Sequence, residues 1–407
     1  MRAGLNDQPE TKAALLSTVG AVYDSLGQYQ DALPILDESL QLQPQTHDRS
    51  RVNTLLELGR ARIGAGKLAD AEGSLQEALH LAQNNFGATS LESGHALWEL
   101  GMLRLQQGQN NDAKDLYIRS LGILETSNAP QADISAVLDD LATVYTREQQ
   151  WALAKQTYER SLEIDRRVLG DNHARVTMRL NNLAIVAQNM GDLPKAESLY
   201  REAIRRHERT YGERHPETAA VKGNLGLLLQ REGRLAEAEP LLRGALDAKL
   251  SVYGPDNYKV GYTRVSLAML LHDQGNLAAA EGEFRQALAI YDKSLPANHL
   301  YRASALMYLA RLLVDSGKSE EALALSEQSL KILTAILPAS NAPTAQAHAI
   351  HAYALAHLGR SHESADELAA AVPTLLNARG PDDPTVRRAQ NWLKEVRPPL
   401  QTASTAR

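Results

Sequence analysis

The stretch Leu180–Gly212 reads LNNLAIVAQNMGDLPKAESLYREAIRRHERTYG, and it contains two amphipathic segments joined at a turn around Gly191. Apolar and small residues recur three or four positions apart in both segments, which places them on one face of a helix. In the first segment they are Leu183, Ala184 and Ala187, and in the second Ala196, Leu199, Tyr200 and Ala203. Neither helix can bury its apolar face alone, so the stretch predicts a helix–turn–helix unit that packs against neighbouring copies.

The turn residue of this unit has counterparts along nearly the whole chain. They are Gly27, Gly66, Gly108, Gln149, Gly191, Gly233, Gly275, Gly317 and Gly359. Successive positions differ by 39, 42, 41 and then five times by 42 residues. A period of this length is typical of a repeat array, and it predicts nine copies of the unit.

Residue size repeats with the same period. Seven residues before the turn residue stand only glycine or alanine: Gly20, Gly59, Gly101, Ala142, Ala184, Gly226, Ala268, Ala310 and Ala352. Positions five and twelve after the turn residue hold only alanine or serine, whereas position nine is large in every copy except at Ser326. Small residues let two helices approach closely, and we expect the large side chains to fill the remaining space.

The pattern resembles the tetratricopeptide repeat, in the 42-residue form found in kinesin light chains. The matching features are leucine–small pairs such as Leu183-Ala184, the turn glycine, the series Ala196, Tyr200, Ala203, and the junctions at Gly170–Ala174 and Gly212–Pro216. The resemblance covers roughly residues 10 to 380. It implies an all-α, right-handed superhelical solenoid of helix–turn–helix repeats, and such repeats serve many different partners.

The period also predicts the organisation of the chain. We expect an N-terminal extension over residues 1–9, nine repeats over 10–380, a capping helix over 381–396 and a disordered tail over 397–407. Trp392 and Leu393 would cover the exposed end of the stack.

Composition excludes several classes of protein. The formal net charge of −6 argues against a nucleic-acid-binding protein, which is usually basic. No run of about 18 apolar residues is present, so we expect no membrane insertion. The absence of cysteine rules out disulfides and suits a reducing compartment, which favours a cytoplasmic location.

The segment NDQPETKAALLSTVGAVYDSLGQYQDA, residues 6–32, resembles the first repeat after the catalytic domain of some bacterial serine/threonine kinases. The chain itself has no glycine-rich loop, no V-A-I-K-type lysine and no H-R-D or D-F-G element. The resemblance therefore implies a sensor region of such a kinase, or association with a kinase domain, as an alternative function.

No catalytic motif stands out, so we predict a protein that is not an enzyme and that uses no cofactor or metal. His348 and His351 are three residues apart on one predicted helix, a weak signal for a metal site that a tolerant last repeat explains better. The acidic pair Asp139-Asp140 lies among polar residues, and we interpret it as part of a solvated face.

Binding of a protein or peptide partner is the favoured function. In a superhelix of helix pairs, the first helix of each pair lines the concave side. Polar and aromatic residues at the lining positions form the predicted groove. They are Trp98, Asn181, Asn182, Gln188, Asn224, Gln230, Arg231, His272, Tyr308 and Arg311.

Asparagine and glutamine offer both a donor and an acceptor, so a row of them can hold a peptide backbone. In the kinesin light chain family, asparagines at the matching positions line the peptide groove, and Asn181, Asn182 and Asn224 are the residues that match here. Alternatively, these asparagines satisfy neighbouring backbone groups. Trp98 is a candidate anchor for a partner, or it simply packs between helices.

The densest basic run extends from Arg201 to His215. It could bind an acidic or phosphorylated segment. Glu202, Glu208 and Glu213 are interspersed with its arginines, and this mixture favours an outer face crossed by ion pairs.

Overall fold

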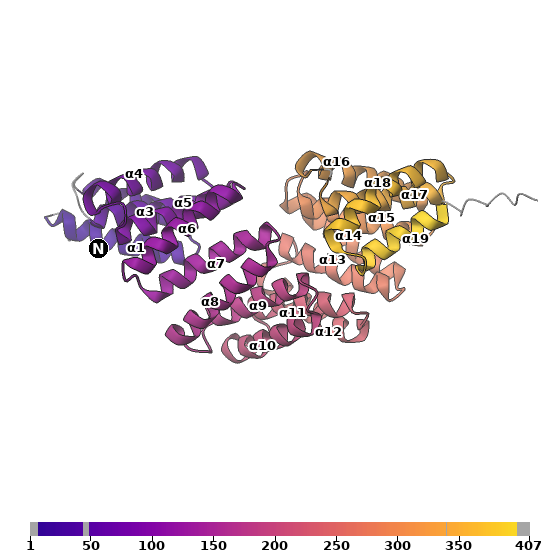
Figure 1. The fold of residues 1–407 in the computed structure, drawn as a ribbon, viewed down its shortest axis with the longest axis horizontal. Helices are drawn as coiled ribbons and strands as arrows, with labels where there is room; N and C mark the ends of the chain where they lie inside the picture. The colour runs from indigo at the N-terminus through magenta and orange to yellow at the C-terminus, as the bar shows by residue number, and fades with distance from the viewer. Residues whose placement is uncertain (1–6, 44–48, 339, 397–407) are drawn as a thin grey trace, which may run out of the picture. The chain divides into compact units, whose positions relative to one another are not determined.

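The computed structural model describes residues 7–43, 49–338 and 340–396 (Figure 1). These residues form two compact units, Met1–Ala203 (unit 1) and Ile204–Arg407 (unit 2). Over the described residues all regular structure is α-helical, which confirms the predicted fold class. None of these helices is long and apolar enough to span a membrane.

The helices follow one another with short connections. Unit 1 contains α1 (Pro9–Ser25), α2 (Tyr29–Leu42), α3 (Arg49–Gly64), α4 (Leu68–Phe86), α5 (Leu91–Gln106), α6 (Asn110–Thr126), α7 (Gln131–Arg147), α8 (Trp151–Leu169) and α9 (Ala174–Asn189). The boundary between the units falls within α10 (Leu193–Tyr211). Unit 2 contains α11 (Pro216–Arg231), α12 (Leu235–Tyr253), α13 (Tyr258–Asp273), α14 (Leu277–Ser294), α15 (Leu300–Asp315), α16 (Ser319–Ile336), α17 (Ala342–His357), α18 (Ser361–Arg379) and α19 (Pro384–Val396).

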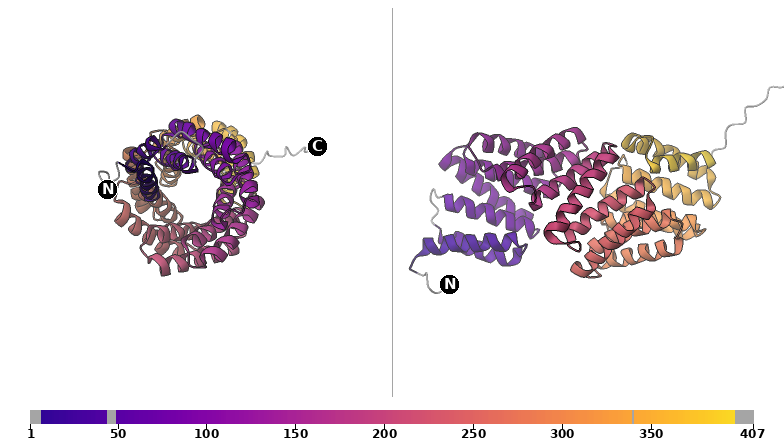
Figure 2. Two further views of the ribbon diagram at one scale, coloured as in Figure 1. Left: turned by 90° about the vertical axis from the view of Figure 1, so that its left-hand side faces the viewer. Right: turned by 90° about the horizontal axis from the view of Figure 1, so that it is seen from below.

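Consecutive helices pack as pairs, and the pairs stack side by side within each unit (Figure 2). In unit 1 the first helices α1, α3, α5 and α7 also contact one another in series. In unit 2 the first helices α11, α13, α15 and α17 do the same, and α19 packs on α17 and α18. Each unit therefore presents a continuous face made of first helices.

The turns between paired helices depend on a left-handed backbone conformation. The turn glycines have φ values from 73° at Gly27 to 84° at Gly191. Glycine adopts this conformation without strain because it has no Cβ. In the fourth repeat Gln149 takes the same position with φ 59°, so a residue with a side chain is held in the strained region.

The small and large repeat positions face each other, as the sequence predicts. A Cβ added to Gly59 would lie 2.3 Å from Leu75 Cδ2, and one added to Gly101 would lie 2.6 Å from Tyr117 Cε1. Gly59 and Gly101 stand seven residues before their turn residues, and Leu75 and Tyr117 stand nine after. The large side chain of the second helix thus occupies the space that the glycine of the first helix leaves free.

Serine at the position twelve after the turn residue has a role that small size alone does not reveal. Its hydroxyl donates a hydrogen bond to a backbone carbonyl of the first helix of the same pair. The bonds are Ser39 to Ala13 (2.7 Å), Ser120 to Gly94 (2.8 Å), Ser161 to Ser135 (2.9 Å) and Ser329 to Ala303 (2.8 Å). Each spans 26 residues, so the bond is a repeated feature of the pair.

The two ends differ in what can be described. At the start, α1 begins at Pro9, while residues 1–6 of the predicted extension lie outside the described residues. After the ninth pair, the buried Trp392 of α19 stacks on Tyr353 of α17 with 4.2 Å between ring centroids. The segment predicted as a disordered tail, residues 397–407, also lies outside the described residues.

Candidate functional site

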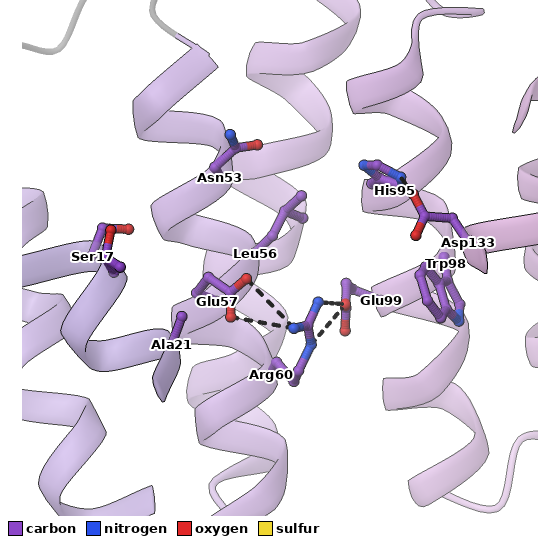
Figure 3. Close-up of a pocket in the computed structure, with 11 residues that line it drawn as sticks. Ser17, Ala21, Asn53, Leu56, Glu57, Arg60, His95, Trp98, Glu99 and Asp133 are labelled. Atoms are coloured by element: carbon purple, nitrogen blue, oxygen red, sulfur yellow. Dashed lines mark hydrogen bonds and ion pairs between the residues drawn. The ribbon is translucent and has the colours of Figure 1, made fainter. Parts of the chain in front are cut away.

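A cavity of about 410 Å³ in unit 1 is lined entirely by first helices (Figure 3). Its residues come from α1, α3, α5 and α7: Ser17, Thr18, Ala21, Asn53, Leu56, Glu57, Arg60, His95, Trp98, Glu99 and Asp133. Three of them are carboxylates and one is an arginine, so the formal charge of the lining is −2 with histidine neutral. We call this the acidic cavity.

Arg60 lies between two carboxylates of the acidic cavity, as Figure 3 shows. Its guanidinium pairs with Glu57 at 3.2 Å, and its Nε donates to Glu99 Oε1 at 2.9 Å. Glu99 is only 2% exposed, and its Oε2 has no hydrogen-bond partner. Burial raises the pKa of Glu99, while the charge of Arg60 acts in the opposite direction. The pair thus places a partly unsatisfied buried carboxylate at the cavity wall.

Trp98 is the predicted groove residue that lines the acidic cavity. Its Nε1 donates a hydrogen bond to Asp140 Oδ2 at 2.6 Å, and its ring packs against the core of unit 1. Trp98 therefore combines the two roles that the sequence left open, because it packs between helices and also faces the cavity.

The interpretation of Asp139-Asp140 as a solvated face is wrong. Asp139 pairs with the buried Arg179 at 2.9 Å, and Asp140 accepts the bond from Trp98. Burial raises the pKa of Asp140 to about 7. The partners come from α5 and α9, the neighbouring first helices on either side, which cannot be read from the polar residues next to the pair in sequence.

The other predicted groove residues of unit 1 lie outside the acidic cavity. Asn182 donates to Asp139 Oδ1 and Asn181 donates to Asn182 Oδ1, both at 3.5 Å. Gln188 accepts a hydrogen bond from Tyr200 at 3.3 Å. These amides contact neighbouring side chains, so they are partly engaged within the unit.

A second cavity, of about 400 Å³, lies in unit 2 and joins residues that are far apart in sequence. Its lining consists of Leu227, Gln230, Arg231, Gly233, Leu235, Met269, Asp273, Tyr308, Arg311, Gln346, Arg379, Asp383, Pro384, Thr385 and Arg388. Four arginines and two aspartates give this lining a formal charge of +2. We call it the basic cavity.

Four of the predicted groove residues, Gln230, Arg231, Tyr308 and Arg311, come together in the basic cavity. Gln230 Nε2 donates to Asp273 Oδ2 at 2.6 Å, and Arg311 donates to Asp273 Oδ1 at 3.1 Å. A single aspartate on α13 thereby orients side chains from α11 and α15.

His272 and Asn224 were predicted for the groove but do not line the basic cavity. His272 is buried behind it, where its Nε2 lies 2.7 Å from Asp315 and its Nδ1 accepts from Arg311 at 2.9 Å. His272 therefore supports Arg311 from behind, and Asn224 is half-buried elsewhere on α11.

Sequence reasoning missed the side chains that close the basic cavity near α19. Arg379 donates to Gln346 Oε1 at 2.9 Å, and Asp383 lies 3.5 Å from Arg231, which is 152 residues away. Arg388 of α19 completes the wall. No periodic signal could identify these residues, because α19 follows the last repeat and has no counterpart in the others.

The remaining sequence candidates are engaged within the protein. His348 and His351 both bond to Glu367, at 2.6 and 2.7 Å. Among the described residues, no group of three or more potential ligands could hold a metal ion.

The basic run from Arg201 to His215 is not an open cationic surface. His207 is buried, and burial lowers its pKa. Arg201 pairs with Glu197 at 2.6 Å, while Glu208 and Glu213 pair with Lys222 at 2.8 and 3.0 Å.

Comparisons with solved structures show chains of the same architecture. The apo quorum sensor NprR from B. thuringiensis has a TM-score of 0.69 at 14% identity, covering 91% of this chain and 99% of its own. A Rap protein in complex with competence and sporulation factor has a TM-score of 0.51 at 14% identity, covering 95% and 99%. A putative kinesin light chain repeat protein from Podosopora anserina is 22% identical with a TM-score of 0.42, covering 51% and 98%.

Sequence comparison identifies the repeats themselves. No curated protein matches the chain. The family model for the tetratricopeptide repeat matches residues 50–126, 133–184, 176–251, 217–293 and 259–335. These segments cover more than half of the chain, and their helices form the stacked pairs described above. The chain therefore belongs to the tetratricopeptide-repeat family.

Proposed function

We propose that this chain is a non-catalytic scaffold that binds a segment of a partner protein along the first-helix face of its repeats. The observation that supports this proposal is the position of the two cavities. First helices line the whole acidic cavity, and they supply much of the lining of the basic cavity. This is the face on which the sequence predicts partner binding.

The acidic cavity suits a cationic side chain of the partner. Glu57, Glu99 and Asp133 outnumber Arg60, and the indole of Trp98 offers an aromatic face close to these carboxylates (Figure 3). A lysine or arginine that enters such a site gains charge-assisted hydrogen bonds and contact with the ring. Asn181, Asn182, Gln188 and Asn224 remain proposed contacts for the backbone of the same segment.

Ligand binding is known for a chain of this fold. The Rap protein reported above was solved in complex with competence and sporulation factor. We extend the capacity for ligand binding to this chain as part of the proposal, while the identity of the ligand follows from its own cavities.

A matched pair of variants tests the proposal. Asn53 is an exposed residue of the acidic cavity, and Gln156 is an exposed residue of the second helix α8. Asn53→Arg and Gln156→Arg make nearly the same chemical change on the two sides of the repeat. After a partner segment has been identified by crosslinking in a native extract, its dissociation constant is measured for both variants.

We expect Asn53→Arg to weaken binding at least about tenfold and Gln156→Arg to leave it unchanged. Equal affinities of the two variants, or a loss confined to Gln156→Arg, would show that the first-helix face is not the binding surface.

The alternative function, a regulatory region of a bacterial serine/threonine kinase, stays a prediction. It rests on the resemblance of residues 6–32, and neither the family match nor the structures reported above add support. Inspection of the reading frame upstream of Met1 for a kinase domain tests it directly.

A further inference from the structure

Arg388 of α19 is an arginine without a partner in the basic cavity. It is half-buried and makes no hydrogen bond or ion pair with the described residues. Burial and the nearby charge of Arg311 lower its pKa. A guanidinium remains charged in proteins, so a cation that is partly removed from water here lacks a counter-ion. The adjacent Arg387, by contrast, is exposed and pairs with Asp382 at 2.5 Å.

The other arginines of the cavity already use the available acceptors. Arg311 bonds to Asp273 at 3.1 Å, and Arg231 lies 3.5 Å from Asp383. With four arginines and two aspartates, the lining retains a formal charge of +2. A carboxylate would supply one negative charge, whereas a phosphate monoester carries about −1.5 to −2 at neutral pH. The excess charge therefore fits a phosphate monoester better than a carboxylate.

Two neutral groups beside these arginines complete the chemistry of the cavity. The hydroxyl of Tyr308 has no hydrogen-bond partner among the described residues, so it can donate to a phosphate oxygen. Gln230 Oε1 is buried and also lacks a donor. A phosphate dianion cannot satisfy this oxygen because it only accepts hydrogen bonds, but a backbone N–H of a peptide can.

We infer that the basic cavity binds the phosphate monoester of a phosphorylated side chain on a partner segment, with Arg388 as its principal contact. Arg388 forms charge-assisted bonds to the phosphate oxygens, Tyr308 donates one more, and Gln230 accepts from the backbone of the segment. The inference rests on the proposed function for the presence of a segment, whereas the phosphate site can be tested without the natural partner.

The first experiment is a calorimetric titration of the full chain with three small probes: phosphoserine, serine and aspartate, each capped at both ends. We expect capped phosphoserine to bind at least tenfold more tightly than capped aspartate, and capped serine to show no binding. Titration with inorganic phosphate separates a peptide-borne phosphate from a free one, and we expect weaker binding because the contact to Gln230 is lost.

Arg388→Gln and Arg387→Gln form the matched pair of variants, since both remove one arginine charge from α19. We expect Arg388→Gln to weaken binding of capped phosphoserine at least about tenfold, and Arg387→Gln to retain the wild-type affinity. Arg388→Lys keeps the charge but loses the bidentate geometry, so we expect an intermediate loss. Circular dichroism of each variant checks that the helices are intact.

Several outcomes would overturn the inference. These are equal affinity for capped phosphoserine and capped aspartate, tighter binding of inorganic phosphate than of capped phosphoserine, and unchanged binding by Arg388→Gln. If a captured partner segment binds equally well before and after phosphatase treatment, the phosphate site is wrong while the scaffold function stands. If capped phosphoserine binds through Arg388 but Asn53→Arg and Gln156→Arg bind the partner equally, the scaffold proposal fails and the phosphate site stands.

Discussion

The acidic and basic cavities occupy the same kind of surface but treat charge in opposite ways. The position nine residues before the turn residue holds Glu57 and Glu99 in unit 1 and Tyr308 in unit 2. The position six before it holds Arg60 in one cavity and Arg311 in the other. The arginine is thus shared, and the residue three positions earlier helps to decide whether the lining is acidic or basic. Repeats with a common backbone can therefore present different binding chemistry.

The largest expected effect comes from the removal of the shared type of charge. Arg60→Met leaves the buried Glu99 without its cation, and breaking such a pair costs about 3 kcal/mol or more. Arg388→Met removes an arginine that has no partner, so we expect a change within about 0.5 kcal/mol. Native-state hydrogen exchange of α5 and of α19 measures the two effects. Similar losses in both variants would contradict the difference between the cavities.

The next effect is a pH dependence specific to unit 1. Burial raises the pKa of Asp140 to about 7 from an ordinary value of 3.8, so between these values the folded state holds a proton that the unfolded state has lost. Stability therefore falls as pH rises from about 4 to about 7 and is level above that range. A shift of this size corresponds to at most about 4 kcal/mol, and we expect about half because the carboxyl is partly open to water.

Asp140→Asn removes this contribution, and urea unfolding at pH 5 and pH 8 measures it. We expect the difference in stability between the two pH values to move by about 2 kcal/mol relative to the wild type. A variant whose pH dependence equals that of the wild type would show that Asp140 titrates normally.

An exchange at the position nine before the turn residue sharpens the comparison directly. Tyr308→Glu introduces into the basic cavity the residue type found at this position in the acidic one. The carboxylate would lie near Arg311 and Arg388 and would compete with an anionic ligand, so we expect capped phosphoserine to bind about tenfold more weakly. Tyr308→Phe removes only the hydroxyl and should cost less. Calorimetry that finds the same affinity for both variants would exclude a charge effect.

The smallest effect concerns the turns. Unit 1 contains Gln149 in a left-handed conformation, while the turn residues of unit 2 are all glycines. Gln149→Gly should stabilise the fourth repeat by about 1 kcal/mol, and the reverse change Gly275→Gln should destabilise the seventh by a similar amount. Thermal unfolding followed by circular dichroism measures both. A loss of stability in Gln149→Gly would mean that the side chain makes a contact worth more than the strain.

The sequence predicted features that recur, because each of them is set inside one repeat. The turn glycines, the Gly59–Leu75 type of contact and the amphipathic pairs belong to this class. The ion pair of Asp139 with Arg179 was missed because its partner lies on the next first helix. Arg388 was missed because α19 has no counterpart elsewhere in the chain. Of the predicted groove residues, those near the basic cavity came together, whereas Asn181 and Asn182 engage each other.

The contact between Arg231 and Asp383 has a consequence for how this protein can evolve. Arrays of this kind commonly gain or lose whole repeats through unequal recombination, because each repeat depends only on its neighbours. In unit 2 the ion pair joins the first complete helix pair to the segment after the last one. Insertion or deletion of one repeat between them would separate these residues and destroy the cavity. Copy number in this part of the gene is therefore expected to be fixed among functional descendants, even where individual surface residues diverge.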